Sequence, residues 1–344
     1  MTKMPGMKEV AELARVSTAT VSRVLSEDSR ISAATRSRVM AAAKELGYIK
    51  SFAASGLASG QNWNVGVILP SVNGWYLSSV LEGIADSLLT RGYDLTLYNS
   101  AGGTHQRILF DDFLLRQRVD GVVIIGTRLE RNEATRLHAV RRPIVSVGDI
   151  SPHAGVIQIH NARAATAATS YLISLGHQRI AYVGGVHDGS PLDDGVSLPL
   201  GGFETAMQQG KLPLNKKWLV RADLTVGGGR RAAMELLNVP REDRPSAIVG
   251  SSDEVAIGVL LAARELNLSV PGQLSVIGID GNELGETFGL TTVDQFAHEQ
   301  GRIAVSQLLM QLASPNGSSA RSHLTCKTEL VIRSSTGFPT IGGY

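Results

Sequence analysis

The sequence predicts an N-terminal all-α head with a helix-turn-helix pattern, then a linker, then an α/β body of two doubly wound lobes built on parallel sheets. Three observations lead to this fold class. Apolar residues recur at helical spacing in three short segments within residues 8–48, strand-like and helix-like segments alternate after residue 63, and 344 residues exceed one domain. The body of roughly 270 residues is about twice a usual domain, so two sheets are expected.

The head is the most informative part of the chain. Its second helical pattern opens with Ser17-Thr18-Ala19-Thr20, and the break at Arg15-Val16 is short enough for a tight turn between helices. A helix that begins at Ser17 carries Thr18, Ala19, Ser22 and Arg23 on the face away from its apolar stripe. Small side chains let a helix enter a major groove, and an arginine reaches a guanine edge or a phosphate. The pattern favours DNA binding over the alternative, an ordinary three-helix bundle with a solvated polar face.

Charge and cysteine content narrow the class of protein. Residues 1–60 hold nine Lys/Arg against five Asp/Glu, whereas the remaining residues hold 24 against 26. The excess of positive charge in the head favours binding to a polyanion, whereas the near-neutral body is expected to bind a different kind of partner. The single cysteine, Cys326, excludes an intramolecular disulfide framework. Neither a signal-peptide pattern nor an apolar run of ~18–20 residues is present, so we expect a cytoplasmic protein with no membrane partner.

The linker at residues 50–64 reads KSFAASGLASGQNWN and allows two interpretations. Gly56 and Gly60 each disfavour a helix by about 1 kcal/mol relative to alanine, which is typical of a flexible tether. Alternatively, the segment becomes helical when DNA and a second copy of the chain hold it. Leu57 is then the large apolar side chain that wedges into a minor groove.

Strands and helices alternate through the body. Amphipathic stretches at residues 77–91, 162–175 and 254–266 separate several strand-like runs, which predicts parallel sheets covered on both faces. Small or polar residues follow many of these runs, as in Gly148-Asp149, Ser251-Ser252-Asp253 and Asp280-Gly281. Because the carboxyl ends of parallel strands face the ligand crevice, we expect a binding site between the lobes. The predicted strands span residues 65–69, 95–98, 119–125, 144–147, 180–183, 247–249 and 274–279.

From about Met7 to Ser334 the chain resembles the lactose-repressor/galactose-repressor (LacI/GalR) family of bacterial transcription factors. The head carries V-A-x-L-A-x-V-S-x-x-T-V-S-R-V-L, then I-S-x-x-T-R-x-x-V, then E-L-G-Y. The body carries L-G-H-x-R-I-A-x-V-G, S-D-E-x-A-I-G, V-P-G-Q-L-S-V-I-G-I-D and L-T-T-V-x-Q in that order. The resemblance implies a helix-turn-helix head, a hinge helix and a core like the periplasmic sugar-binding proteins. It also implies a homodimer that binds a pseudo-palindromic operator and responds to a small effector, namely a saccharide or derivative.

The resemblance also implies domain boundaries. The head occupies residues 1–50 and the hinge residues 51–62. The N-terminal lobe takes residues 63–161 and 293–321, the C-terminal lobe residues 162–292 and 322–334, and a tail residues 335–344. That tail has no heptad pattern, so no C-terminal tetramer is expected.

DNA contacts carry over position by position. Thr18 and Ala19 match the pair that usually sets operator preference, and Leu57 matches the leucine that opens the central operator step. Ser32, Thr35 and Tyr48 match backbone-contact positions. The hinge departs from the family at Lys50-Ser51, where Pro-Asn is common, and at Ser55, where arginine is common. The implied DNA-binding set is Ser17, Thr18, Ala19, Thr20, Ser22, Arg23, Ser32, Thr35, Tyr48 and Leu57.

Effector contacts carry over less completely. Asp280 matches the aspartate that binds ligand hydroxyls, and an aromatic face at Trp75 or Tyr76 can stack on a sugar ring or a base. Pro199 stands where the family has an arginine that clamps the effector, and proline has no donor to replace it. Either Arg163 or Arg230 clamps instead, or the ligand differs from a simple hexose, or the response is lost. The implied effector-binding set is Asn73, Trp75, Tyr76, Asp149, Ser252, Asp280 and Gln295.

Other function classes find less support. The sequence shows no G-x-S-x-G elbow, no H-E-x-x-H, no G-x-x-x-x-G-K-[ST] and no strand followed by G-x-G-x-x-G, so we expect no enzyme and no cofactor. The acidic residues of the 187–203 loop lack metal-ligand spacing, so no metal is expected. His177 precedes a strand, where a structural hydrogen bond is the safer assignment. Two alternatives remain: a global regulator with a protein co-effector and a degenerate sugar site, and a solute-binding receptor, which the basic head opposes.

Overall fold

A computed structural model describes residues 5–25, 30–48, 61–100, 118–127, 129, 131–139, 142–148, 155–158, 161–185, 199–314 and 323–340. The chain divides into two compact units, residues 1–63 and residues 64–344. The first unit is the head, and the second contains two lobes, each with its own sheet.

Three helices form the head: α1 (Met7–Ala14), α2 (Thr18–Leu25) and α3 (Ala33–Glu45). Val10, Val21 and Val39 are fully buried at the centre of its small core. Arg15 adopts a left-handed conformation with φ 53°, which turns the chain sharply between α1 and α2. The head confirms the three helical patterns and the tight turn that the sequence predicts.

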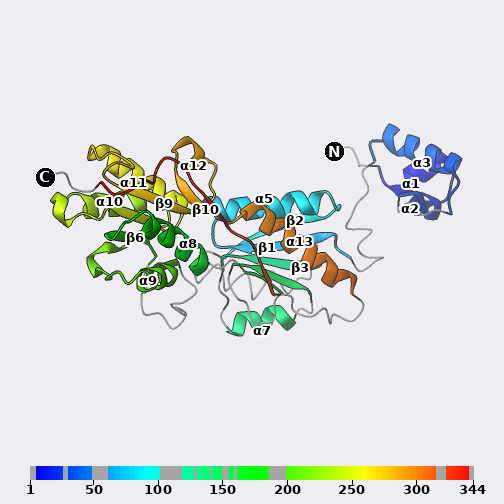
Figure 1. The fold of residues 1–344 in the computed structure, drawn as a ribbon. Helices are drawn as coiled ribbons and strands as arrows, with labels where there is room; N and C mark the ends of the chain where they lie inside the picture. Colours follow the sequence, from blue (N-terminus) through cyan, green and yellow to red (C-terminus); the bar gives the residue numbers. More distant parts are fainter. Residues whose placement is uncertain are drawn as a thin grey trace. The chain divides into compact units, whose positions relative to one another are not determined.

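The first lobe is a six-stranded sheet in the order β11-β5-β4-β3-β1-β2, with every described pairing parallel. Helices α5 (Trp75–Leu89) and α13 (Ala297–Ala313) pack on one face, and α7 (Arg131–Ala139) packs on the other (Figure 1). Successive strand residues point to opposite faces, so Val67 packs toward α5 and Ile68 packs toward α7. The strands are β1 (Asn64–Leu69), β2 (Asp94–Asn99), β3 (Gly121–Ile125), β4 (Ile144–Val147), β5 (Gly155–Gln158) and β11 (His323–Thr325).

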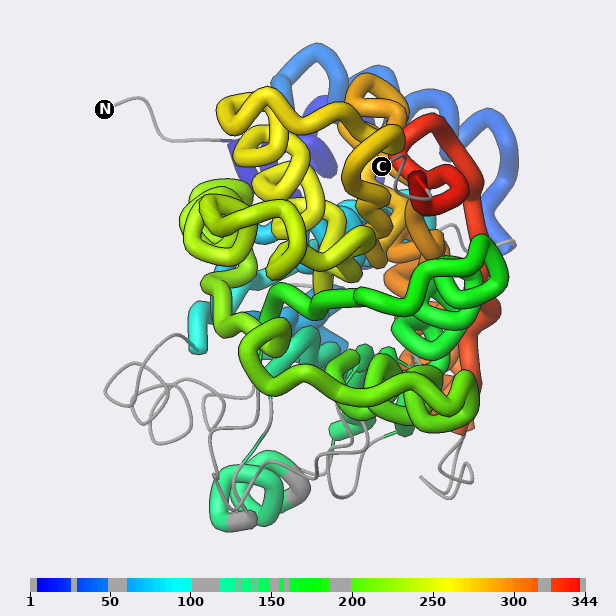
Figure 2. Tube along the Cα trace, turned by 60° about the vertical axis from the view of Figure 1, so that its left-hand side comes forward, coloured from blue at the N-terminus to red at the C-terminus, as the bar shows by residue number. Residues whose placement is uncertain are grey.

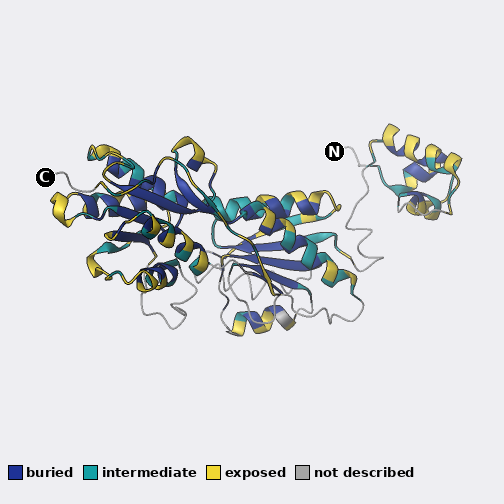
Figure 3. Cartoon of the chain, in the orientation of Figure 1, coloured by how far each residue is buried: buried dark blue, intermediate teal, exposed yellow. Residues whose placement is uncertain are grey.

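The second lobe has the order β12-β10-β9-β8-β6-β7, and β12 is antiparallel to β10. Helices α8 (Asn161–Ser174) and α9 (Pro199–Gln209) cover one face, and α10 (Val226–Leu237) and α11 (Asp253–Glu265) cover the other. Buried strands lie between the exposed outer faces of these helices (Figure 3). The strands are β6 (Ile180–Gly184), β7 (Leu219–Arg221), β8 (Ala247–Gly250), β9 (Ser275–Asp280), β10 (Thr291–Asp294) and β12 (Glu329–Val331); short helices are η3 (Lys216–Trp218), η4 (Arg241–Asp243) and α12 (Leu284–Thr287).

Helix α9 approaches α8 closely because Gly202 has no side chain. A Cβ atom at Gly202 would lie 1.9 Å from the Ala162 carbonyl oxygen, far inside van der Waals contact. The hydroxyl of Thr166 donates to the Gly202 carbonyl over 3.0 Å, which ties the two helices together at the same point. Pro199 is the first residue of α9, where its missing N–H removes no intrahelical hydrogen bond.

The structure corrects the expected lobe boundaries in three places. All of β10 belongs to the second-lobe sheet, so the chain does not change lobes between residues 292 and 293. Strand β11 pairs with β5 in the first lobe, although residues 322–334 were expected in the second. Ser335 is buried and its hydroxyl accepts from Thr291 N over 2.8 Å, so the expected tail begins as part of the second lobe. In Figure 2 the red C-terminal segment runs beside green α8, where Tyr171 Oη lies 3.4 Å from Thr336 Oγ1.

The seven predicted strands are confirmed, whereas β5, β7, β10, β11 and β12 were not predicted. All five lie at or next to a sheet edge, and each has only three or four residues, too few for a clear alternating pattern. Within the described ranges, no helix combines the length and apolar character that crossing a membrane requires.

Candidate DNA-binding face and ligand site

Helix α2 presents a polar face to solvent. Thr18, Ala19, Ser22 and Arg23 are exposed, while Val21 and Val24 are buried against the other two helices. The 3.6-residue period of the helix separates these two sets, as the sequence predicts. The exposed set combines small side chains with one long cation, which suits close approach to a major groove.

Ser17 has a structural role at the start of α2. Its Oγ accepts from Thr20 N over 3.1 Å and lies 2.9 Å from Thr20 Oγ1. It is therefore an N-cap, which satisfies one of the otherwise unpartnered N–H groups of the first turn. The other first-turn N–H groups give this end of α2 a partial positive charge that favours a phosphate.

Ser32 and Thr35 form the same arrangement at the start of α3. Ser32 Oγ accepts from Thr35 N over 3.3 Å and lies 3.0 Å from Thr35 Oγ1. Tyr48 is half-buried and packs against the head core. Leu57, the rest of the 51–60 hinge and Asp149 lie outside the described residues, so their roles stay predictions.

A row of polar groups lies along the carboxyl ends of the second-lobe strands. Asp280 ends β9, Gln295 follows β10, Ser251 follows β8, and Tyr182 lies near the end of β6. Gln295 Nε2 donates to Asp280 Oδ1 over 2.9 Å. A Cβ atom at Gly184 would lie 2.0 Å from Ser251 Oγ and 3.1 Å from Tyr182 Oη, so these two hydroxyls border the same point.

Three atoms of this row lack hydrogen-bond partners. Tyr182 Oη, Ser251 Oγ and Gln295 Oε1 are buried and make no hydrogen bond of good geometry to another residue in the described part of the chain, although the Tyr182 and Ser251 hydroxyls lie close enough to interact with each other. An unsatisfied buried polar group costs about 1–3 kcal/mol. Three of them on one sheet edge are a physical signature of a site that a polar ligand completes.

Asp280 and Asp253 form a buried acidic pair at this edge. Burial raises the pKa of Asp253 to about 6, although Thr292 and the N–H groups of Asn282 and Gly281 all donate to its carboxylate. Burial and the nearby Asp253 charge raise the pKa of Asp280 well above its usual range. Asp253 has the richer set of donors, so a proton shared by this pair favours Asp280 over Asp253. A protonated Asp280 both donates to and accepts from ligand hydroxyls.

The backbone at Asp280 is also unusual. Its φ of 136° lies in a region that side chains other than glycine rarely adopt. Such conformations cost about 1–3 kcal/mol and cluster at functional sites. The strain therefore supports a role for Asp280 beyond packing.

A hydrogen-bond chain joins this edge to the first lobe. Tyr76 Oη donates to Gln300 Oε1 over 2.7 Å, and Gln300 Nε2 donates to the Gln295 carbonyl over 2.6 Å. Glu254 of α11 accepts from Trp75 N over 3.2 Å, so the second lobe caps the start of α5. Asn73 is exposed, whereas the Trp75 and Tyr76 rings are half-buried against the first-lobe core.

Several expected contacts have structural partners instead. Ser252 caps α11, because its Oγ accepts from Val255 N over 3.2 Å. Arg230 pairs with both carboxylate oxygens of Glu265 at 2.6 Å, which argues against it as the effector clamp. Arg163 is exposed on the first turn of α8.

The contacts of His177 confirm the prediction that this side chain makes structural hydrogen bonds. Its Nδ1 lies 2.9 Å from Ser246 Oγ and its Nε2 lies 2.9 Å from the Gly337 carbonyl. Burial lowers the pKa of His177, so the ring is neutral at pH 7.

Sequence reasoning missed Tyr182, Ser251, Gln300 and Glu254. A tyrosine near the end of the otherwise aliphatic 180–184 strand was a usable signal, because a buried hydroxyl needs a partner. Glu254 lies in the S-D-E-x-A-I-G block, but nothing in that block indicates a contact with the other lobe, and no local pattern distinguishes Gln300.

Comparisons with known proteins agree with this architecture. Residues 6–51 match the family model described as bacterial regulatory proteins, lacI family, and residues 169–336 match the periplasmic binding protein-like domain. The chain is 34% identical over 329 residues to the ribose operon repressor of Escherichia coli (strain K12), covering 94% of this chain and 97% of that protein. This protein belongs to the LacI family.

Two further matches extend the LacI-family assignment. The HTH-type transcriptional repressor CytR of Escherichia coli (strain K12) is 32% identical over 334 residues, covering 96% of each chain. A crystal structure of the lac repressor dimer bound to operator and the anti-inducer ONPF has a TM-score of 0.82 and 27% identity, covering 97% of this chain and 100% of that one. The LacI-family protein is therefore a DNA-binding transcriptional regulator, and its relatives are repressors rather than enzymes.

Proposed function

We propose that this LacI-family protein is a cytoplasmic bacterial repressor that binds a pseudo-palindromic operator as a homodimer. A small sugar-like ligand, bound at the carboxyl edge of the second-lobe sheet, controls its operator affinity. The exposed polar face of α2 supports the DNA-binding role, and the three unpartnered buried atoms support the ligand site. The protein performs no catalysis and joins the nucleoid when it is bound to DNA.

The operator is read by α2 from each of two heads. Thr18 and Ala19 approach base edges, and Arg23 contributes a bidentate contact to guanine or a phosphate contact. Two half-sites lie about 34–36 Å apart, one turn of DNA, because two-fold symmetry places both heads on one face of the duplex. The hinge with Leu57 occupies the minor groove between them.

The ligand completes the polar row at the second-lobe edge. A polyhydroxylated ring offers both donors and acceptors, which match the Asp280 carboxyl group, the Tyr182 and Ser251 hydroxyls and Gln295 Oε1. Similarity to the ribose operon repressor makes ribose the first compound to test. The unpartnered atoms favour a small ligand over a degenerate site with a protein co-effector. In a site that no longer bound a ligand, these buried polar atoms would cost stability without any compensating hydrogen bond.

Ligand binding is transmitted through the Asp280–Gln295–Gln300–Tyr76 chain to α5 of the first lobe. A ligand that contacts Asp280 and Gln295 favours one arrangement of the lobes over another. A coupling free energy of about 1–3 kcal/mol changes operator affinity by roughly 5–150-fold. That range is sufficient for a transcriptional switch.

The DNA-binding role is tested by selecting operators from random duplexes with wild type and two matched variants. Arg23→Ala should lose sequence selectivity, with specific affinity falling by about 1–3 kcal/mol. Arg38→Ala removes the same charge from α3 and should lower affinity for all sequences alike. An Arg23→Ala protein that enriches the same motif with unchanged affinity would contradict the role of α2.

The ligand role is tested by thermal-shift measurements against ribose, other pentoses, hexoses and nucleosides, followed by operator release assays. A ligand at about 100 times its Kd stabilises the folded state by about 2.7 kcal/mol. Tyr76→Ala should weaken release while operator binding stays intact, and Tyr76→Phe separates loss of the hydroxyl from loss of the ring. Equal loss of operator binding and release in Tyr76→Ala would reject the transmission role.

A further inference from the structure

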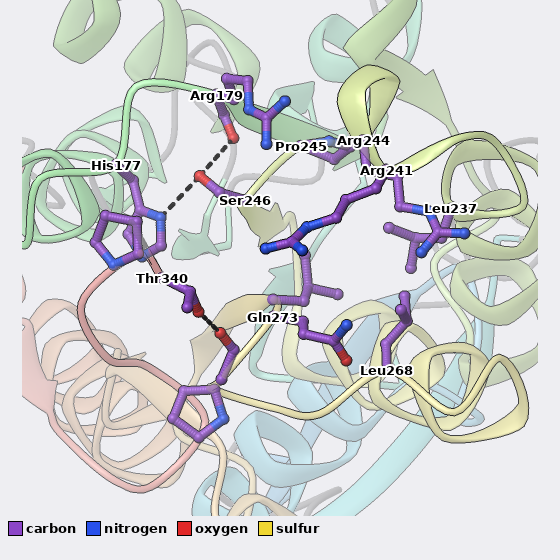
Figure 4. A pocket seen from close by; sticks show the side chains of 14 residues that line it. His177, Arg179, Leu237, Arg241, Arg244, Pro245, Ser246, Leu268, Gln273 and Thr340 are labelled. Carbon is purple, nitrogen blue, oxygen red and sulfur yellow. Dashed lines mark hydrogen bonds between the residues drawn. The ribbon is translucent and has the colours of Figure 1, made fainter. Parts of the chain in front are cut away.

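The second lobe has a cavity at the opposite edge of its sheet from Asp280. Its wall includes Arg179 and Ser246, which directly precede β6 and β8 (Figure 4). It also includes Leu274, which directly precedes β9. Strand β9 separates this edge from Asp280 by six residues, or about 20 Å at 3.3 Å per residue. The cavity is therefore distinct from the proposed effector site.

We infer that this cavity binds a compact oxyanion, namely a phosphate group. Arg179, Arg241 and Arg244 all line it, and the described residues of its wall include no aspartate or glutamate. Arg241 shares the short helix η4 with Glu242 and Asp243, and neither acidic residue belongs to the wall. Three guanidinium groups without a facing carboxylate produce a local positive potential that a bound anion neutralises.

Two of the arginines are held in place by the backbone. Arg179 Nη1 donates to the Glu242 carbonyl over 2.8 Å, and Arg244 Nε donates to the Val239 carbonyl over 2.7 Å. Each guanidinium has five N–H groups, so both keep donors for a ligand. The Arg241 side chain makes no hydrogen bond or ion pair with another residue in the described ranges, so its whole planar fork is available.

The uncharged part of the wall combines leucine and proline side chains with a few hydrogen-bonded polar groups. Ser246 Oγ lies 2.9 Å from His177 Nδ1 and 3.2 Å from the Arg179 carbonyl, and the Thr340 hydroxyl donates to the Gly272 carbonyl (Figure 4). The first two bonds link the segments that precede β6 and β8, and the third links the segment that precedes β9 to the C-terminal segment. Gln273 adds an amide, which can donate to an anion oxygen.

The size of the cavity limits what it holds. Its volume is about 50 Å³, whereas a drug-sized ligand needs roughly 300–1,000 Å³ and a single buried water needs about 10–15 Å³. A whole sugar does not fit, but a group of a few heavy atoms does. A tetrahedral phosphate offers acceptor oxygens in several directions, which matches arginines that come from two separate segments of the chain.

The test is isothermal titration of the full-length protein at constant ionic strength with inorganic phosphate and, separately, with glycerol 2-phosphate. Wild type should bind at least one of them, and Arg241→Gln should bind about tenfold more weakly or not at all. Arg302→Gln removes the same charge from exposed α13, where Arg302 pairs with Glu299, and should bind as wild type does.

The two ligands distinguish the source of the phosphate group. Binding of inorganic phosphate alone indicates a site for the free ion, and binding of the monoester as well indicates a site for a phosphorylated metabolite; both outcomes support the inference. Failure of wild type to bind either ligand, or equal binding by Arg241→Gln and wild type, would overturn it. Because Arg241 is exposed and has no partner to lose, the variant should fold, which circular dichroism checks.

Discussion

The buried acidic pair at the ligand edge should make the stability of the protein depend on pH, with Asp253→Asn as the decisive perturbation. Asp253 Oδ2 accepts from Gly281 N at 2.9 Å and Asn282 N at 2.7 Å, and Oδ1 accepts from the Thr292 hydroxyl at 2.6 Å. An asparagine oxygen in the Oδ2 position keeps both backbone bonds, and its amide group can donate to Thr292 Oγ1. The variant therefore removes the titrating proton and preserves the loop.

The magnitude follows from the change in pKa. Burial raises the pKa of Asp253 from 3.8 to about 6, so the folded state holds this proton more tightly than the unfolded state. Unfolding then releases a proton between these values, and stability falls as pH rises through the window. The full effect is about 3 kcal/mol at 1.36 kcal/mol per pKa unit, and the part between about pH 5 and about pH 7.5 is about 1.4 kcal/mol.

Urea titrations of wild type and Asp253→Asn at these two pH values measure this difference. Wild type should gain about 1.4 kcal/mol relative to the variant on acidification from about pH 7.5 to about pH 5. Taking the difference between the two proteins cancels the contributions of groups that do not interact with Asp253, including His177, whose lowered pKa acts in the opposite direction. Asp280 is the exception, because the Asp253 charge helps to raise its pKa. A stability difference that is the same at both pH values would refute the raised pKa of Asp253.

Two other substitutions test the packing and the capping. Gly202→Ala should lower the unfolding free energy by at least about 1 kcal/mol, because its Cβ would lie 1.9 Å from the Ala162 carbonyl oxygen. Gly227→Ala on α10 is the control, because its added Cβ atom would meet no other residue closer than 3.6 Å. This variant should be more stable than wild type by up to about 1 kcal/mol in thermal melts. If Gly202→Ala were stabilised by a similar amount, the close α8–α9 packing would be contradicted. Ser17→Ala should lower the stability of α2 by about 1 kcal/mol, because it removes the side chain that caps Thr20 N. Backbone amide hydrogens in α2 should then exchange about fivefold faster than in wild type. Ser17→Asp keeps a capping oxygen and should exchange at the rate of wild type. Unchanged exchange in Ser17→Ala would show that the cap does not hold α2 in solution.

The sequence alone predicted the elements whose pattern is local. The helical spacing of Val10, Val21, Val24 and Val39 marked the head helices, and all four valines are buried in the structure. Runs such as 65–69 and 119–125 marked central strands, because a strand buried on both faces is largely apolar. Asp280 was also within reach, because it follows the predicted strand at residues 274–279 and carries a polar group, whereas Gln295 follows an unpredicted strand and was expected only from the family resemblance.

Only the tertiary structure decided which strand ends meet. Tyr182, Ser251, Asp280 and Gln295 come from four strands whose order in the sheet is β10-β9-β8-β6, and no local pattern encodes that order. The same holds for β11, which joins the first lobe through hydrogen bonds to β5, more than 150 residues earlier in the chain. The spacing of apolar residues along the sequence indicates which face of its own helix or strand a residue occupies. The partner across a sheet, and therefore the ligand site and the arginine-lined cavity, depends on long-range packing that a single sequence does not reveal.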